Sequence, residues 1–223
     1  MSRIAPDRPD VAGADLRPVV LLEGAGAAGR LEPLDLRVAP GVLALLGANG
    51  AGKSTLLALM TGRLPPTSGR VWVAGAPARS PAAARARADV PQGVSYPPRA
   101  RVSELLGVAR AARGVGDAAA ADAIVRMGLG PLLDRRSARL SGGERQRLAL
   151  ACALMGAPPV WFLDEPAASL DRDGLARLAG WVRAHAEAGG TVVVGAHRDE
   201  EVAAYGPTRK LRLEAGRVVG DDA

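Results

Sequence analysis

Residues 47–54 read GANGAGKS and match the pattern G-x-x-x-x-G-K-[ST]. An apolar run, Val42 to Leu46, comes directly before this stretch, and a helix-like run begins at Leu56. Glycines in such a loop let backbone N–H groups turn toward phosphate oxygens, and the N-terminus of the following helix adds the positive end of its dipole. At this chain's own residue frequencies the pattern arises by chance about once in 500 sequences of this length. The stretch therefore predicts a nucleotide phosphate site.

Within this loop the lysine is informative, because only two of the 29 basic residues of the chain are Lys. Lys53 supplies a point charge for the β- and γ-phosphates, and the hydroxyl of Ser54 suits Mg²⁺. The predicted nucleotide-binding residues are Gly47, Ala48, Asn49, Gly50, Ala51, Gly52, Lys53, Ser54 and Thr55.

The composition limits what surrounds this loop. A chain of 223 residues is long enough for one domain with a buried core, so we expect a tail at 1–18 without structure and a single domain at 19–223. The longest uncharged runs, 38–52 and 148–163, contain Gly or Pro, and neither predicts a membrane-spanning helix. The N-terminus has no secretory pattern, and the single Cys152 excludes an internal disulfide.

The net charge of +6 and the pI near 10.5 raise the question of nucleic-acid binding. Nearly all of the positive charge is Arg, spread through Ala- and Arg-rich stretches, which is typical of a solvated arginine-rich surface. We therefore expect no nucleic-acid partner. If the alternative held, DNA binding would depend steeply on salt.

Two carboxylates follow a second buried strand. Val160 to Leu163 are apolar, and Asp164 and Glu165 come next, at the edge of a parallel sheet where ligands bind. Asp164 suits the ligand shell of Mg²⁺, and Glu165 can accept a proton from an attacking water. The remaining pattern alternates strands with helices, which predicts an α/β fold with a parallel, helix-flanked sheet and a closing hairpin at 211–219.

A further stretch gives the family. Residues 140–147 read LSGGERQR, with Ser141 standing 23 residues before Asp164, and Ser169-Leu170-Asp171 follow the acidic pair. With the phosphate loop, this combination resembles the nucleotide-binding subunit of an ABC transporter over about 19–219. The resemblance implies a P-loop NTPase fold with a RecA-like core sheet, an antiparallel β subdomain and a small helical subdomain at about 93–155.

The resemblance also implies roles for single residues. Gln92, which lies 39 residues after Lys53, falls at the glutamine that reaches Mg²⁺ and the attacking water, and His197 falls at the histidine that contacts the γ-phosphate. Glu165 falls at the catalytic base, Asp164 and Ser54 at the magnesium ligands, and Asp171 at the dimer-contacting D-loop. The implied cofactors are ATP and Mg²⁺. The implied activity is hydrolysis of ATP to ADP and phosphate.

The signature also has a physical meaning of its own. Ser141 is a good N-cap, Glu144 stands three residues on as in a capping box, and Gly142 and Gly143 allow the backbone to approach an anion closely. A capped helix alone explains Ser141 and Glu144 but not the two glycines. In the family, two subunits pack head to tail, so that ATP lies between the phosphate loop of one and Ser141 to Gly143 of the other.

One departure from the family concerns recognition of the nucleotide's adenine base. Family members stack adenine on an aromatic side chain before the phosphate loop, but this chain has no Phe, Tyr or Trp before Trp72. We therefore expect weak discrimination among purine nucleotides. Elsewhere we expect Cys152, Trp161 and Trp181 in the core and His185 on a helix surface.

The resemblance implies partners and a place in the cell. We expect a second copy or a homologous nucleotide-binding subunit, together with an integral membrane permease that holds the chain at the cytoplasmic face of the membrane. A short helical subdomain and no C-terminal regulatory extension favour export over import. The alternatives are a soluble regulatory or nucleotide-sensing module that is not coupled to transport, and a soluble cassette protein of translation or DNA maintenance, which would carry two cassettes or a long insertion.

Overall fold

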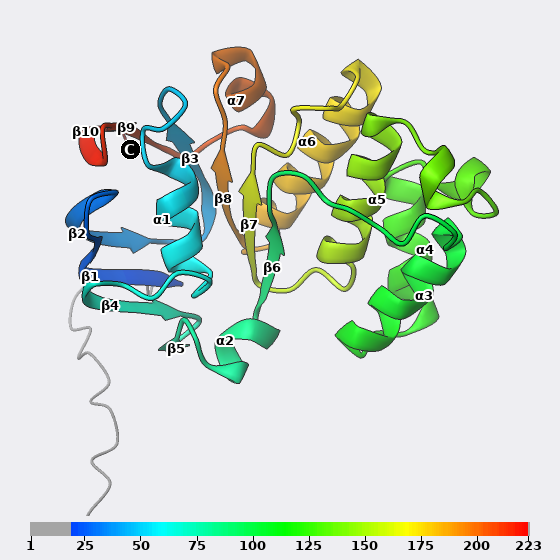
Figure 1. The fold of residues 1–223 in the computed structure, drawn as a ribbon, viewed down its shortest axis with the longest axis horizontal. Helices are drawn as coiled ribbons and strands as arrows, with labels where there is room; N and C mark the ends of the chain where they lie inside the picture. The colour runs from blue at the N-terminus through cyan, green and yellow to red at the C-terminus, as the bar shows by residue number, and fades with distance from the viewer. Residues whose placement is uncertain (1–18, 223) are drawn as a thin grey trace, which may run out of the picture.

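A computed structural model describes residues 19–222 and contains two β-sheets (Figure 1). The larger sheet has the order β10-β9-β3-β8-β7-β6; β9, β3, β8, β7 and β6 run parallel, and β10 pairs with β9 antiparallel. Its strands are β3 (Gly41–Leu46), β6 (Arg87–Val90), β7 (Val160–Asp164), β8 (Thr191–Gly195), β9 (Arg209–Glu214) and β10 (Arg217–Asp222).

The smaller sheet is antiparallel, with the order β2-β1-β4-β5. Its strands are β1 (Val20–Ala27), β2 (Leu31–Val38), β4 (Ser68–Val73) and β5 (Ala76–Pro77). Helix α1 (Lys53–Met60) lies between the two sheets and packs against strands of both.

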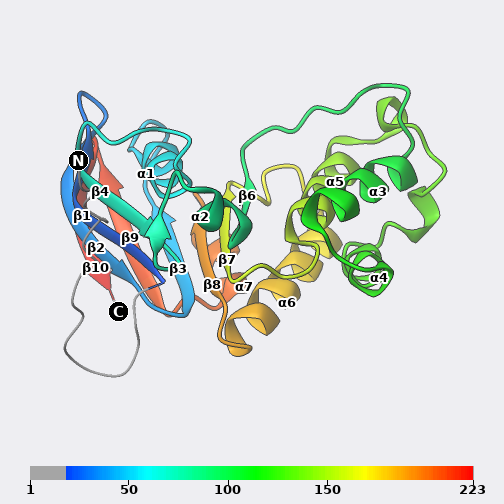
Figure 2. The same cartoon turned by 90° about the horizontal axis from the view of Figure 1, so that it is seen from below.

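The other helices lie mostly at the opposite end of the molecule, where α3, α4 and α5 form a group away from the antiparallel sheet (Figures 1 and 2). These helices are α2 (Pro81–Arg85), α3 (Val102–Arg113), α4 (Asp117–Arg126), α5 (Gly142–Leu154), α6 (Arg172–Glu187) and α7 (Asp199–Tyr205), with 3₁₀ turns at Gly130–Leu132 and Ser137–Arg139. Within residues 19–222, no helix combines the length and apolar character needed to cross a membrane.

Alternation along β3 divides the interior into two cores. Val42 and Leu46 face the helices α3 to α6, while Leu43 and Leu45 face α1 and the antiparallel sheet. Every residue of β3 is buried, because successive side chains of a strand point to opposite faces and both faces are covered. The phosphate loop thus leaves a strand that is fixed from both sides.

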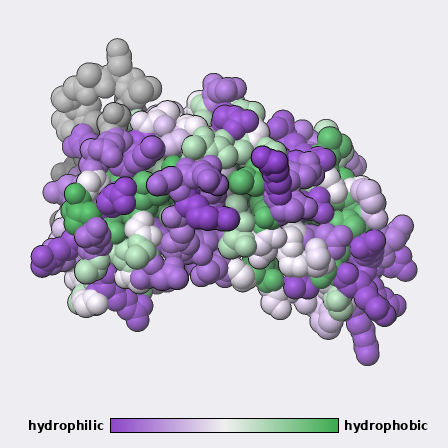
Figure 3. Space-filling model, turned by 90° about the horizontal axis from the view of Figure 1, so that it is seen from above, coloured by the Kyte–Doolittle hydropathy of each residue, from purple (hydrophilic) through white to green (hydrophobic). Residues whose placement is uncertain are grey.

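The surface outside these cores is largely polar. Hydrophilic side chains spread over the face in Figure 3, and apolar ones are scattered among them. The exposed large apolar residues of the described chain are Val108 and Val125 on α3 and α4, and Val218 and Val219 on β10.

The structure adds two features that the sequence analysis did not give and corrects one expectation. β1 continues through the glycine-rich stretch to Ala27, because irregularities in its pairing with β2 absorb the extra residues. Helix α7 had no counterpart in the sequence analysis. His185 is buried rather than on a surface, with its ring stacked 3.8 Å from that of Trp161.

Other expectations are confirmed. Trp161 and Trp181 are buried, and the closing hairpin is β9–β10. Cys152 is partly buried and packs against the helical core. The expected tail at 1–18 lies outside the described residues.

Candidate active site

The phosphate loop connects β3 to α1 and packs against the β9–β10 hairpin. Gly47 has φ 150°, and a Cβ at this position would collide with the backbone oxygen of Leu213 on β9. The Gly216 N–H, in the turn of the same hairpin, donates to the Ala51 carbonyl at 3.0 Å. Only glycine fits at residue 47, because the loop must pass so close to another strand.

Lys53 is the buried cation of this loop. Lys53 is only 4% exposed. Its Nζ donates to the carbonyl oxygens of Gly47 at 2.7 Å and Ala48 at 3.1 Å. Burial lowers the pKa of Lys53, and the carboxylates of Glu165 and Asp164 oppose that shift. Within residues 19–222 no carboxylate lies within 4.0 Å of Nζ, so the charge has no close anionic partner there. A phosphate group fits this arrangement.

Asp164 ends β7 beside the start of α1. The hydroxyl of Ser54 donates to Asp164 Oδ1 at 3.1 Å, and Asp164 is 5% exposed. Burial raises the pKa of this carboxyl, and the hydrogen bond from Ser54 opposes the shift. Carboxylate and hydroxyl oxygens are the kind of ligand that Mg²⁺ prefers, usually with substrate phosphates completing the shell. In the described part of the chain no group of three or more His, Cys, Asp or Glu side chains is placed to hold a metal ion.

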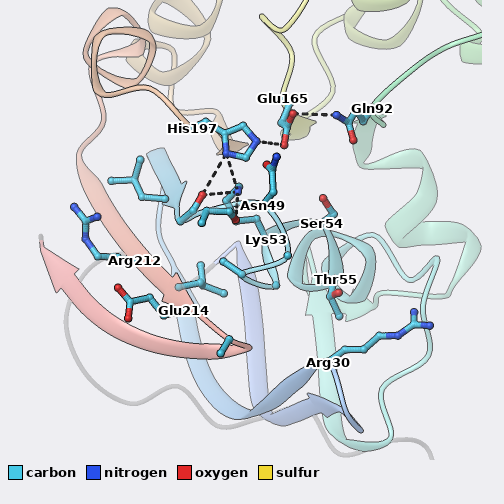
Figure 4. A pocket seen from close by; sticks show the side chains of 18 of the residues that line it. Arg30, Asn49, Lys53, Ser54, Thr55, Gln92, Glu165, His197, Arg212 and Glu214 are labelled. Atoms are coloured by element: carbon cyan, nitrogen blue, oxygen red, sulfur yellow. Dashed lines mark hydrogen bonds and ion pairs between the residues drawn. The ribbon is translucent and has the colours of Figure 1, made fainter.

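Glu165 occupies an unusual backbone position directly after this strand. Its φ of 48° is in the left-handed region, which costs a non-glycine residue about 1–3 kcal/mol, and its N–H donates to the Gly195 carbonyl at 2.9 Å. The carboxylate is held from two sides, by Gln92 Nε2 at 3.0 Å and by His197 Nε2 (Figure 4). A strained backbone that aims one carboxylate into a cavity is typical of a catalytic position.

The hydrogen bonds also indicate the tautomer of His197. Its Nδ1 lies 3.2 Å from Lys53 Nζ, and an ammonium group can only donate. Nδ1 therefore accepts from Lys53, and Nε2 carries the proton that faces Glu165. Lys53, His197, Glu165 and Gln92 form one continuous chain of hydrogen bonds along the cavity (Figure 4).

A cavity of about 1490 Å³ opens over the loop and is lined by most of the predicted residues. Gly47 to Thr55, Gln92, Glu165 and His197 line it, and Asp164 reaches it through Ser54. Four charged residues that the sequence did not suggest also line it, namely Arg30, Asp199, Arg212 and Glu214. They come from the β1–β2 turn, α7 and β9, and no local pattern in the sequence marks them, because only tertiary contacts bring these elements to the loop.

The signature residues lie elsewhere, at the start of α5. Ser141 and Glu144 form the expected capping box, with Glu144 N–H donating to Ser141 Oγ at 3.1 Å and Ser141 N–H donating to Glu144 Oε2 at 2.7 Å. This backbone hydrogen bond lowers the pKa of Glu144. None of Ser141 to Glu144 lines the cavity of this chain. Asp171 likewise lies outside it and caps α6 by accepting from the Gly174 N–H at 2.8 Å.

The two signature glycines have different surroundings. A Cβ on Gly143 would lie 2.8 Å from the backbone oxygen of Ser169, in the loop that follows Glu165. A Cβ on Gly142 would lie 3.7 Å from the Ser169 side chain, which is ordinary contact. The sequence analysis assigned both glycines to close approach of an anion. Packing within the chain already requires Gly143, so only Gly142 lacks a structural reason.

Comparisons with known proteins identify the family of this chain. The family model described as ABC transporter matches residues 31–168. The cytochrome c biogenesis ATP-binding export protein CcmA of Ruegeria pomeroyi is 40% identical over 80% of this chain and 85% of its own length. The hemin import ATP-binding protein HmuV of Streptomyces coelicolor is 37% identical over 98% of this chain and 83% of its own length.

Solved structures share the fold of this chain. The fold of an ATP-binding subunit of an ABC transporter superposes with a TM-score of 0.84 at 24% identity, covering 92% of this chain and 90% of that one. An ATP-bound bacterial Atm1-family ABC exporter gives a TM-score of 0.80 at 26% identity, covering 98% of this chain and 40% of that one. The chain therefore belongs to the ABC transporter family, as an ATP-binding subunit with the P-loop NTPase fold expected from its sequence.

Proposed function

We propose that this chain hydrolyses ATP at the cavity between Lys53 and Glu165 and thereby drives a separate membrane permease. ATP-binding subunits of this family hydrolyse ATP. The observation that carries the assignment of residues is the placement of Glu165, whose carboxylate is held by Gln92 and His197 at one end of a cavity that begins at a buried lysine.

Each residue of the cavity has a role in this proposal. The backbone of Gly47 to Gly52 and the ammonium of Lys53 bind the phosphates, with Thr55 at the end of the loop. Glu165 accepts the proton of the attacking water, while Gln92 and His197 orient its carboxylate and contact the water and the γ-phosphate. The free cation of Lys53 offsets the charge that develops on the phosphate oxygens.

Magnesium would be held by the oxygens of Ser54 and Asp164, with Gln92 near enough to the cavity to contribute. Bound there, Mg²⁺ would supply positive charge that offsets the negative charge developing on the phosphate oxygens.

A second subunit completes the site in this proposal. Ser141, Gly142, Gly143 and Glu144 begin a helix whose N-terminus is exposed and lies outside the cavity over the phosphate loop. Two copies, or one copy and a homologue, would pack head to tail, so that this helix N-terminus meets the phosphates bound by the other subunit, with Asp171 at the contact. The permease would hold the pair at the cytoplasmic face of the membrane.

The direction of transport stays a prediction. The relatives include an export protein, CcmA, and import proteins, HmuV and the cobalamin import ATP-binding protein BtuD of Halobacterium salinarum, which is 41% identical over 79% of this chain. The relatives therefore do not favour export over import. The alternative of a nucleotide-sensing module predicts ATP binding without turnover.

Glu165→Gln tests the hydrolytic role. The amide keeps the shape of the side chain but cannot accept the proton, so ATP hydrolysis should fall by about 10²–10⁴ while ATP binding survives. Glu214→Gln, the same change at the rim of the cavity, is the matched control and should keep its turnover. Unchanged hydrolysis in Glu165→Gln would reject the base assignment. Wild-type chain that binds ATP but never hydrolyses it, with the permease co-expressed, would favour the sensing module.

A further inference from the structure

The cavity has no aromatic platform for a base. Among its lining residues in the described chain there is no Phe, Tyr or Trp. A nucleotide held by its phosphates alone would leave the base in water, and an ATP-binding site of this size has room for the whole nucleotide.

The two ends of the cavity fix which way a bound nucleotide points. On the proposed function, the γ-phosphate lies beside Glu165, Gln92 and His197, because the bond that breaks is there. Figure 4 shows Ser54, Thr55 and Arg30 following one another away from that end. The triphosphate runs along the loop, so the nucleoside leaves it near Thr55, on the side of Arg30.

The backbone that carries Arg30 is anchored to the phosphate loop. Arg30 N–H donates to the Ala27 carbonyl at 2.9 Å and closes the turn between β1 and β2. Glu32 N–H donates to the Gly216 carbonyl at 2.8 Å, and Gly216 N–H donates to Ala51 of the loop at 3.0 Å. Arg30 therefore keeps its place relative to the bound phosphates.

The side chain of Arg30, by contrast, is available. Arg30 is exposed, and in residues 19–222 no carboxylate lies within 4.0 Å of its guanidinium. The nearby carboxylate of Glu32 instead forms an ion pair with Arg217, at 2.6 Å. Arg212, the other free arginine of the cavity, projects on the other side of the loop from Thr55, together with Glu214 (Figure 4).

We propose that the Arg30 guanidinium is the surface on which the base of the bound nucleotide stacks, an inference that rests on the proposed ATP site. A guanidinium is planar and weakly hydrated, and it packs face to face on aromatic rings. Stacking reads the face of a base and not its hydrogen-bonding edge, so adenine and guanine are accepted alike. Arg30 thus sets affinity for the nucleoside part of the ligand with little selectivity between purines.

The test compares ligands with and without a base. Binding of the non-hydrolysable analogues AMP-PNP and GMP-PNP and of inorganic tripolyphosphate is measured by calorimetry on the full chain. Arg30→Ala should weaken both analogues by about 3- to 30-fold and leave tripolyphosphate within about twofold. Arg30→Tyr should bind the analogues as wild type does, because it restores a stacking plane without the charge. Arg212→Ala, which removes the same charge across the loop, should change the ratio of analogue to tripolyphosphate affinity by less than about twofold.

Two outcomes would overturn the role of Arg30 and leave the ATP site intact. Equal weakening of tripolyphosphate and the analogues by Arg30→Ala would make Arg30 a phosphate contact. Unchanged analogue binding in Arg30→Ala would mean that the base lies elsewhere. Wild-type chain that binds neither tripolyphosphate nor the analogues would overturn the phosphate site, and the proposed function with it.

Discussion

Helices α1 and α5 both begin in glycine-rich sequence suited to phosphate, yet their surroundings differ. The N-terminus of α1 lies between two sheets and contains a buried lysine. Asp164, at the end of β7, lies next to it, and the cavity opens over it. The N-terminus of α5 lies in the helical end of the molecule, exposed, capped by its own serine and outside that cavity (Figure 1). The first is a pocket within one chain. In the proposed function, the second is a surface that meets a ligand bound by another chain.

The largest expected effect is at the enclosed site, the phosphate loop and cavity at the N-terminus of α1. Lys53→Ala removes the only cationic side chain of the loop, and loss of its charge-assisted contacts should weaken ATP binding by about a hundredfold or more and abolish turnover. Lys210→Ala, at the only other lysine, removes an equal charge from an exposed position on β9 and is the control. Equilibrium binding and phosphate release measure both variants. Full ATPase activity in Lys53→Ala would end the assignment of the loop.

The exposed site, the N-terminus of α5, is tested by its two glycines. Gly143→Ala should cost about 1–3 kcal/mol of unfolding free energy, because the new methyl meets the Ser169 backbone oxygen. Gly142→Ala has room for the methyl and should change stability by less than about 1 kcal/mol. It should nevertheless lower turnover, since the methyl occupies the space through which a phosphate of the other subunit approaches.

Urea unfolding and ATPase assays on both glycine variants separate these effects. A stable Gly142→Ala variant with wild-type turnover would contradict a phosphate role for this helix N-terminus. A Gly143→Ala variant as stable as wild type would show that the α5 contact with Ser169 relaxes at no cost.

The smallest effect concerns the core beside β7, the strand that ends at Asp164. His185 stacks on Trp161, and burial lowers the pKa of His185. The unfolded chain therefore binds the proton more readily, and the stability that the neutral ring contributes is lost as pH falls through and below the ordinary histidine value of about 6.5. Unfolding midpoints at pH 7.5 and 5 should drop more in wild type than in His185→Phe. Equal drops in both would mean that His185 titrates normally in the folded chain.

Much of the architecture follows from local sequence. The phosphate loop, the acidic strand, the capping box at Ser141 and the closing hairpin are each encoded within a few neighbouring residues. Helix α7 could not be predicted, because its seven residues combine an acidic first turn with few apolar positions, and only Val202 and Tyr205 of its apolar residues are fully buried. His185 was placed on the surface because histidine in a helix carries no sign of the Trp161 ring beneath it.

The cavity shows the same limit. Its phosphate end comes from one continuous stretch, whereas Arg30 and Arg212 join it only after the β1–β2 turn and β9 pack against the loop. Residues brought together by sheet closure leave no spacing pattern in the sequence.

The central claim is that the enclosed site of one chain is completed by the exposed helix of another. The most direct measurement is the molecular mass of Glu165→Gln by size-exclusion chromatography with light scattering, with and without Mg-ATP, alone and with the permease co-expressed. ATP that stays intact should hold a dimer, and a second change, Ser141→Arg, should return it to monomer by placing bulk at the start of α5. Glu165→Gln that stays monomeric at saturating Mg-ATP in both settings, or a dimer that survives Ser141→Arg, would contradict it.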